Sequence, residues 1–232
     1  MDIKQTNADL IRFWGDAISL SEEDKQTLAD APKDLSALAP SPELFAAAKS
    51  LGTYKRVLDY GCGHGWASVI AASSGAKTVE AVDMSPSIIE AASYYAKAFG
   101  VSERIDAHVI DAAWLFKRGE GSYDAVICSN VLDVVPKQTA MEIIQGLHAS
   151  LSPNGKAIIG LNFYLSPEAA SKRGMDLKDG CLFVNGILRL SSLSDEDWFS
   201  LFEPFFIVEK LEYFAWTGEE KKTRRLFWLR KR

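Results

Sequence analysis

The residues most able to do chemistry are an acid and three glycines within residues 57–66, which read Val-Leu-Asp-Tyr-Gly-Cys-Gly-His-Gly-Trp. The apolar start of this stretch predicts a buried strand. Gly61, Gly63 and Gly65 predict a loop whose backbone amides can approach a ligand closely. Residues 67–72 are helix-forming, so the unit is a strand, a glycine loop and a helix N-terminus. Such a unit favours an anionic group of a ligand.

Asp59 distinguishes between two classes of ligand. Dinucleotide-binding proteins use similar glycine loops, but a carboxylate at the strand tip would repel a pyrophosphate. The same carboxylate would attract the ammonium and sulfonium groups of S-adenosylmethionine (SAM). Trp66 also stands where the dinucleotide fingerprint has its third glycine. The loop therefore favours SAM over NAD, with Asp59, Gly61, Cys62 and Gly63 at the cofactor.

These residues resemble the first SAM-binding motif of the class I SAM-dependent methyltransferases, an acid followed by Gly-x-Gly-x-Gly. Four later segments follow in the order of that family: residues 79–85, 108–112, 123–130 and 151–156. The last of them resembles the Leu-x-Pro-Gly-Gly turn of the family, with Asn154 in place of a glycine. The resemblance covers roughly residues 55–165, and it implies SAM as the cofactor.

The resemblance also implies roles for residues at the predicted strand ends. Asp83, twenty residues after Gly63, stands where the family binds both ribose hydroxyls with a carboxylate. Asp111 stands where the family faces the adenine amino group, although an aspartate there could equally cap a helix. The further cofactor-binding residues implied are Asp83, Met84, Asp111, Ala112, Ser129 and Asn130.

Candidates for the substrate side come from both ends of the chain. Residues 7–20 place apolar side chains at helical spacing behind Asn7 as a possible N-cap. This helix either closes over the cofactor as a lid or packs on the domain. More than half of the aromatic side chains lie from Phe163 onward, where they can wall an apolar pocket. The candidates are Phe13, Trp14, Asp133, Tyr164, Phe183 and Trp216.

Strands and helices alternate between residues 55 and 160, which predicts an α/β fold with a doubly wound, mostly parallel sheet. The resemblance implies seven strands and a terminal antiparallel hairpin, for which residues 205–211 and 225–229 are suited. Asn185-Gly186 predicts the turn of another hairpin. Helices are expected near residues 22–30, 65–74, 86–99, 112–118 and 137–151, with one more opening at Ser41-Pro42.

One domain is expected over residues 1–232. Its parts would be a helical N-terminal extension that caps the domain (1–52), a SAM-binding core (55–160), and a substrate-side insertion with the closing hairpin (161–232).

Composition limits the partners. A net charge of −5 disfavours nucleic acid as a partner. The three cysteines are widely spaced and predict reduced thiols, with no metal site. Neither a signal-peptide core nor a membrane-spanning run is apparent, so a cytoplasmic protein without a membrane partner is expected.

The sequence thus predicts a SAM-dependent methyltransferase that acts on a small molecule by in-line displacement. The alternatives are an RNA or protein methyltransferase and a SAM-binding module without catalysis. The leaving thioether needs no protonation, so no catalytic residue is required and none is assigned. The Asn/Asp-Pro-Pro-Tyr/Phe motif for flipped adenines is absent from residues 129–133. The acceptor and the oligomeric state stay open.

Overall fold

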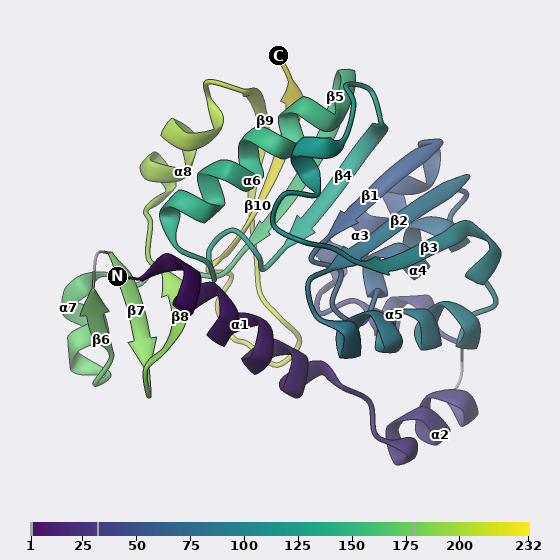
Figure 1. Ribbon diagram of the computed structural model, residues 1–232, viewed down its shortest axis with the longest axis horizontal. Helices are drawn as coiled ribbons and strands as arrows, with labels where there is room; N and C mark the ends of the chain where they lie inside the picture. Colours follow the sequence, from purple (N-terminus) through teal and green to yellow (C-terminus); the bar gives the residue numbers. More distant parts are fainter. Residues whose placement is uncertain (1, 32, 179) are drawn as a thin grey trace.

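The computed structural model describes residues 2–31, 33–178 and 180–232. Its main sheet has seven strands in the order β3-β2-β1-β4-β5-β10-β9 (Figure 1). The strands are β1 (Arg56–Tyr60), β2 (Thr78–Asp83), β3 (Ile105–Val109), β4 (Tyr123–Ser129), β5 (Leu151–Leu161), β9 (Phe206–Phe214) and β10 (Arg224–Lys231). The first five run parallel, whereas β10 is antiparallel to β5 and to β9. The predicted sheet with its closing hairpin is confirmed.

Helices cover both faces of this sheet (Figure 1). One face packs on α3 (Pro42–Ser50) and α4 (Trp66–Ser73) through a core that includes Leu44 and Ile70. The other face packs on α6 (Lys137–Ser150) and α8 (Asp195–Phe202) through a core that includes Ile144 and Trp198. Burial on both faces explains the near-continuous apolar runs of the central strands.

A second, three-stranded antiparallel sheet follows β5. Its strands are β6 (Asp176–Lys178), β7 (Cys181–Val184) and β8 (Ile187–Ser191), preceded by α7 (Pro167–Lys172). Asn185 and Gly186 both have positive φ, as a tight two-residue turn requires, so the predicted hairpin is confirmed. Neither α7 nor β6 was expected.

The N-terminal segment contains α1 (Ile3–Ile18) and α2 (Glu22–Asp30). The expected N-cap was wrong: the Asp2 side chain accepts a hydrogen bond from the Gln5 amide, so α1 begins earlier and Asn7 lies within it. Helix α1 contacts both β8 and α5 (Pro86–Ala98), and thus lies across the space between them (Figure 1).

The expectation of a helix near residues 112–118 was also wrong. Only a 3-10 turn, η4 (Leu115–Lys117), forms there. The amides of Trp114 and Lys117 bond to carbonyls three residues earlier, so the segment winds as a 3-10 turn. The other short 3-10 turns are η1 (Leu35–Leu38), η2 (Leu51–Thr53) and η3 (Ser102–Arg104). Within the described ranges, no helix is both long and apolar enough to cross a lipid bilayer.

Candidate active site

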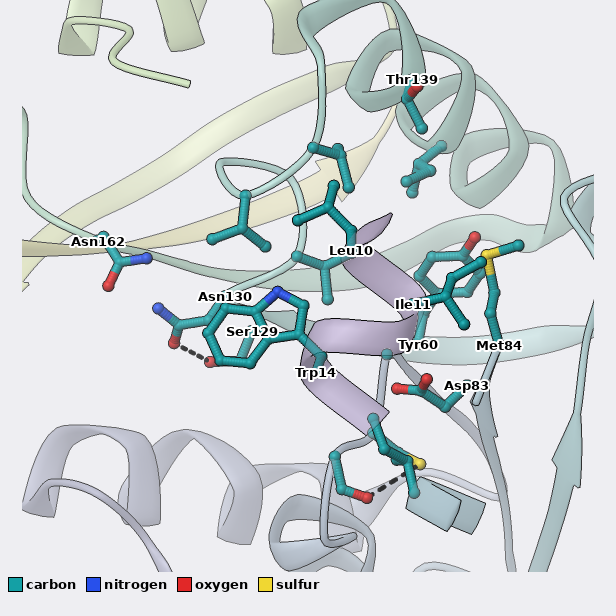
Figure 2. A pocket seen from close by; sticks show the side chains of 18 of the residues that line it. Leu10, Ile11, Trp14, Tyr60, Asp83, Met84, Ser129, Asn130, Thr139 and Asn162 are labelled. Atoms are coloured by element: carbon teal, nitrogen blue, oxygen red, sulfur yellow. Dashed lines mark hydrogen bonds between the residues drawn. The ribbon is translucent and has the colours of Figure 1, made fainter. Parts of the chain in front are cut away.

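A pocket of about 610 Å³ lies at the carboxyl ends of the central parallel strands, where open α/β sheets bind ligands. Its lining combines the glycine loop after β1 with residues at the ends of β2 and β4 and with side chains of α1. In Figure 2, Asp83 and Met84 lie on one side of the Trp14 indole, and Asn130 and Asn162 lie on the other. The pocket is large enough for an organic cofactor.

The glycine loop is held by its own amides. The amides of Gly61 and Cys62 donate to the Val82 carbonyl at 2.8 and 3.0 Å, which ties the loop to β2. Gly61 has a φ of 70°, and a Cβ there would lie 2.3 Å from a methyl carbon of Val131. Gly63 also has positive φ, but a Cβ there would meet nothing within 4 Å. Gly63 therefore faces the open space of the pocket.

Asp59 lies behind this loop and is not among the described residues that line the pocket. Its Oδ2 accepts hydrogen bonds from the Ser68 amide at 3.1 Å and the Ser68 hydroxyl at 2.6 Å, so it ties β1 to the first turn of α4. Burial raises the pKa of Asp59 to about 6, while the bonds from Ser68 act in the opposite direction. Asp59 thus supports the loop, and the direct contact expected with a ligand stays a prediction.

Asp83 and Met84 lie where the sequence places them, at the end of β2 and in the pocket lining. The Asp83 carboxylate accepts a hydrogen bond from the Ser85 amide at 3.1 Å. Burial raises the pKa of Asp83, and hydrogen bonds from backbone amides, including that of Gly63, oppose this rise. A partly buried carboxylate next to an open glycine is suited to accept hydrogen bonds from vicinal hydroxyl groups.

The third predicted acid takes a different place. Asp111 is exposed, accepts from the Ala113 amide at 3.0 Å and pairs with Lys117 at 3.1 Å. The pocket is lined instead by its neighbours Ile110 and Ala112. The Asp111 side chain thus stabilises the local turn before η4 and caps no helix, while Ala112 lines the pocket.

Ser129 and Asn130 line the pocket at the end of β4. Asn130 has a φ of 58°, and its amide donates to the Gly160 carbonyl at 2.8 Å. Its side-chain oxygen accepts from the Ser129 hydroxyl (Figure 2). The Asn130 Nδ2 is buried and has no partner among the described residues, so a donor is left for a ligand.

Helix α1 forms a wall of the pocket with Leu10, Ile11 and Trp14 (Figure 2). Leu10 is also buried against Phe183 and Leu188 of the small sheet. The helix therefore packs on the domain and covers the pocket at once, and the lid remains a prediction. Phe13 stacks edge-on against Trp14 and is outside the pocket lining as described.

The other substrate-side candidates lie in different parts of the structure. Trp216 lines the pocket, whereas Phe183 is buried behind Leu10. Tyr164 is 46% exposed and lines a second, smaller pocket. Asp133 is 0% exposed and accepts from the Asn162 amide at 2.5 Å, so it anchors the end of β5 instead of facing the main pocket.

Several lining residues were missed by the sequence reasoning: Thr139, Glu142, Asn162, Arg173 and Arg189. Only Arg189 carried a local signal, since a cation interrupts the apolar strand Ile-Leu-Arg-Leu. Among the histidines, His64 lines the pocket beside Tyr95, and burial lowers its pKa.

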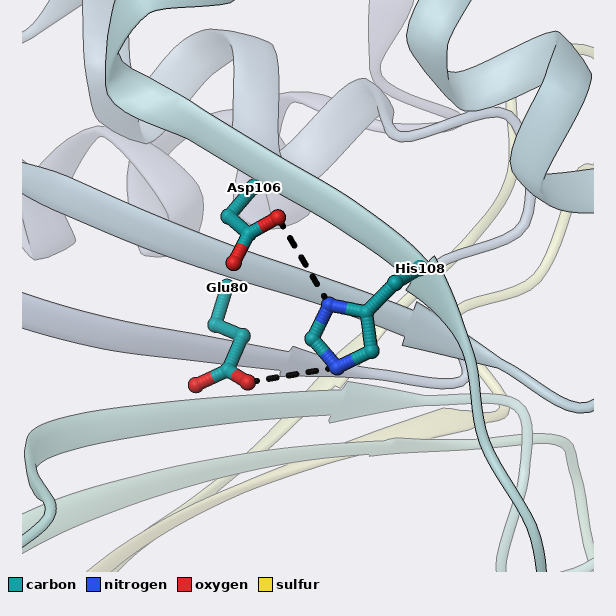
Figure 3. A group of neighbouring side chains, drawn as sticks. All are labelled: Glu80, Asp106 and His108. Carbon is teal, nitrogen blue, oxygen red and sulfur yellow. Dashed lines mark ion pairs between the residues drawn. The ribbon is translucent and has the colours of Figure 1, made fainter.

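A cluster of Glu80, Asp106 and His108 lies on the outer strands β2 and β3 (Figure 3). The His108 ring nitrogens lie 3.3 Å from Glu80 and 3.7 Å from Asp106. Glu80 also accepts from the Tyr123 hydroxyl and faces Arg118 at 3.6 Å. The Tyr123 hydroxyl and the Arg118 guanidinium thus already contact the Glu80 carboxylate. We therefore interpret the group as an ion-pair network that stabilises this edge of the sheet.

Comparison with known proteins places this pocket in context. The methyltransferase domain family matches residues 57–155. The ubiquinone biosynthesis O-methyltransferase of Xanthomonas axonopodis pv. citri (strain 306) is 36% identical over 132 residues, which are 56% of this chain and 53% of that protein. The chain thus spans about half the length of the curated relatives it matches.

Solved structures extend the likeness to the fold. The 1,6-didemethyltoxoflavin-N1-methyltransferase of Burkholderia thailandensis, solved with 1,6-didemethyltoxoflavin and S-adenosylhomocysteine, aligns over 100% of this chain and 91% of its own, with a TM-score of 0.70 and 17% identity. A SAM-dependent methyltransferase of Mesorhizobium loti aligns over 86% of this chain and 99% of its own, with a TM-score of 0.61 and 19% identity. At these identities the likeness concerns the fold.

Proposed function

We propose that this chain, which carries a methyltransferase domain over residues 57–155, is a class I SAM-dependent methyltransferase that transfers the methyl group of SAM to a small molecule. The observation that carries this proposal is that the main pocket is lined on two sides by different parts of the chain. Asp83, Met84 and the glycine loop form one, at the strand ends. Helix α1, β8 and residues 162–175 form the other, which leaves a place for an acceptor beside the cofactor.

The residues present fit SAM, which is the cofactor. Asp83 would bind the ribose hydroxyls, and Met84 with Ala112 would lie against the adenine. The unpartnered Asn130 amide would donate to the methionyl part. Gly63 leaves space that a side chain would fill.

The chemistry requires little of the protein beyond placement. Bound SAM supplies a methyl carbon on a positively charged sulfur, so that the acceptor's lone pair forms the new bond and the sulfur keeps the electrons of the broken one. The acceptor's proton passes to the solvent outside the pocket, before the acceptor binds or after the product leaves. The apolar side chains Leu10, Ile11 and Trp14 would exclude water from the reacting atoms and hold the acceptor in line.

A small acceptor is favoured by the enclosure. Helix α1 packs on the small sheet on one side and contacts α5 on the other, so a folded protein or an RNA would have to displace it. In this proposal residues 1–52 cap the pocket, 55–160 bind SAM and 161–232 form the acceptor side, all within one domain. The curated relatives are O-methyltransferases, which favours an oxygen as the acceptor atom.

Transfer of labelled methyl groups tests this function. The protein is incubated with methyl-labelled SAM and a size-fractionated cell extract, and a reaction without protein serves as the control. We expect the label in the small-molecule fraction, because the enclosed pocket admits only small acceptors. Label mainly in protein or RNA would contradict the small acceptor, and no transfer to any fraction would favour a SAM-binding module.

Removal of α1 separates a lid from a packing helix. We expect a chain without residues 2–20 to fold and to release S-adenosylhomocysteine faster than the full chain, because the pocket loses the wall made by Leu10 and Trp14. Stopped-flow displacement gives the release rate, and circular dichroism reports folding. A deletion that prevents folding would show that burial of α1 is needed for the domain.

A further inference from the structure

Arg189 brings a positive charge into the lining of the pocket from the small sheet. Its guanidinium carbon lies 4.4 Å from the ring centre of Phe13 and 6.0 Å from that of Trp14. The side chain is half-buried, and neither an ion pair nor a hydrogen bond to Arg189 is formed by any described residue. Two aromatic rings thus hold a guanidinium whose N–H groups stay available.

Among the buried polar atoms of the pocket lining that have no partner in the described part of the chain, three are donors and one, Asn7 Oδ1, is an acceptor. Arg173 lines the same pocket as a second cation. The indole N–H groups of Trp14 and Trp216 and the Asn130 amide are buried, with no acceptor in the described part of the chain. Of the lining acids, Asp83 accepts from the Ser85 amide and Glu142 accepts from Gln138. Buried donors without acceptors are costly, so their presence in a pocket indicates an acceptor-rich ligand.

We propose that Arg189 binds an anionic group, a carboxylate or a phosphate, of the methyl acceptor. This inference rests on the proposed function. A planar guanidinium held by aromatic rings can offer two parallel N–H groups to such an anion. The methyl group goes to another atom of the acceptor, so the product keeps its negative charge.

The methionyl carboxylate of SAM is a second source of the same chemistry. The position of Arg189 favours the acceptor over SAM as the source of the anion. Arg189 lies on β8, in the insertion after β5, and not at the ends of the main strands. Asp83, Met84 and Ser129, in contrast, all lie at the ends of the main strands. The affinity for S-adenosylhomocysteine, which keeps the methionyl carboxylate of SAM, distinguishes the two sources.

The first measurement is a calorimetric titration of S-adenosylhomocysteine into the wild type, Arg189→Met and Arg12→Met. Arg12 is an exposed arginine on α1 that pairs with Asp9 and is not among the described lining residues, so it is a matched control. We expect all three affinities to agree within about twofold. A loss of tenfold or more in Arg189→Met alone would assign Arg189 to the methionyl carboxylate and overturn the proposal.

The second measurement follows the product of the labelled reaction on an anion-exchange column at pH 7. We expect the labelled small molecule to be retained and to elute with salt. At limiting acceptor, Arg189→Met should form it roughly 10- to 100-fold more slowly, since it lacks a charge-assisted hydrogen bond. Arg189→Lys should recover part of the rate, and Arg12→Met should match the wild type.

Three further outcomes, all from the labelled reaction, would contradict this inference. Label in the unretained fraction, or an unchanged rate in a folded Arg189→Met, overturns the anionic acceptor and leaves the proposed function intact. No transfer of label by the wild type overturns the proposed function and this inference with it.

Discussion

Replacement of Asp83 by alanine is expected to weaken SAM binding about 5- to 150-fold. The side chain is the only carboxylate that the described lining offers at the ends of the main strands. Its loss would leave two ribose hydroxyls without a charged acceptor, a cost of about 1 to 3 kcal/mol, which corresponds to that range of affinity. Isothermal titration with SAM measures the effect directly.

Asp106 provides a matched control for this experiment. It lies on the neighbouring strand β3, faces His108 and is exposed. Asp106→Ala should bind SAM as the wild type does, and Asp83→Asn should lie between the wild type and alanine because it keeps an acceptor oxygen. If Asp83→Ala folds and binds SAM with unchanged affinity, Asp83 does not belong to the cofactor site.

Asp59→Asn is expected to change how stability depends on pH. In the folded protein the pKa of Asp59 is raised to about 6 by burial, from an ordinary value of 3.8. The folded chain therefore holds a proton that the unfolded chain releases between these values. The free energy of unfolding should fall as pH rises from about 4 to about 6, by about 3 kcal/mol from this group.

The asparagine variant has no proton to lose, so its stability should fall less over the same range. Urea unfolding of both proteins at pH 4, 5, 6 and 7 gives the difference. Burial also raises the pKa of Asp83 and Asp133, but these groups are common to both proteins and cancel. Equal pH dependence in the two proteins would mean that Asp59 titrates in the folded state as it does in the unfolded state. Asp106→Asn, at an exposed site, should follow the wild type.

The sheet could be predicted because its signals are local. Alternating strands and helices fix the parallel core, and Asn185-Gly186 supplies the two positive φ angles of a hairpin turn. Asn154 adopts a φ of 61° where the family has a glycine, which asparagine tolerates better than other side chains. Residues at the glycines and strand ends could therefore be assigned to one edge of the sheet.

The direction of individual side chains was harder to predict. Asp59, Asp111 and Asp133 all occur at or after strand ends, yet two of them turn to backbone amides of their own surroundings and one bonds to Ser68. Sequence spacing places a residue at an edge of the sheet but does not say which nearby donor its carboxylate finds. Arg189 was missed for the opposite reason, since its partners on α1 are far away in the sequence.

The attachment of the small sheet bears on how such proteins can diverge. Besides its packing on α1, the sheet is hydrogen-bonded near Asp133: the Ser191 amide donates to the Asp133 carbonyl, and the Ser191 hydroxyl donates to the Val135 carbonyl. The family match ends at residue 155, before this sheet begins. Under the proposed function, substitutions on the pocket side of residues 166–192 would change which acceptor fits, while the parallel strands and the glycine loop stay as they are.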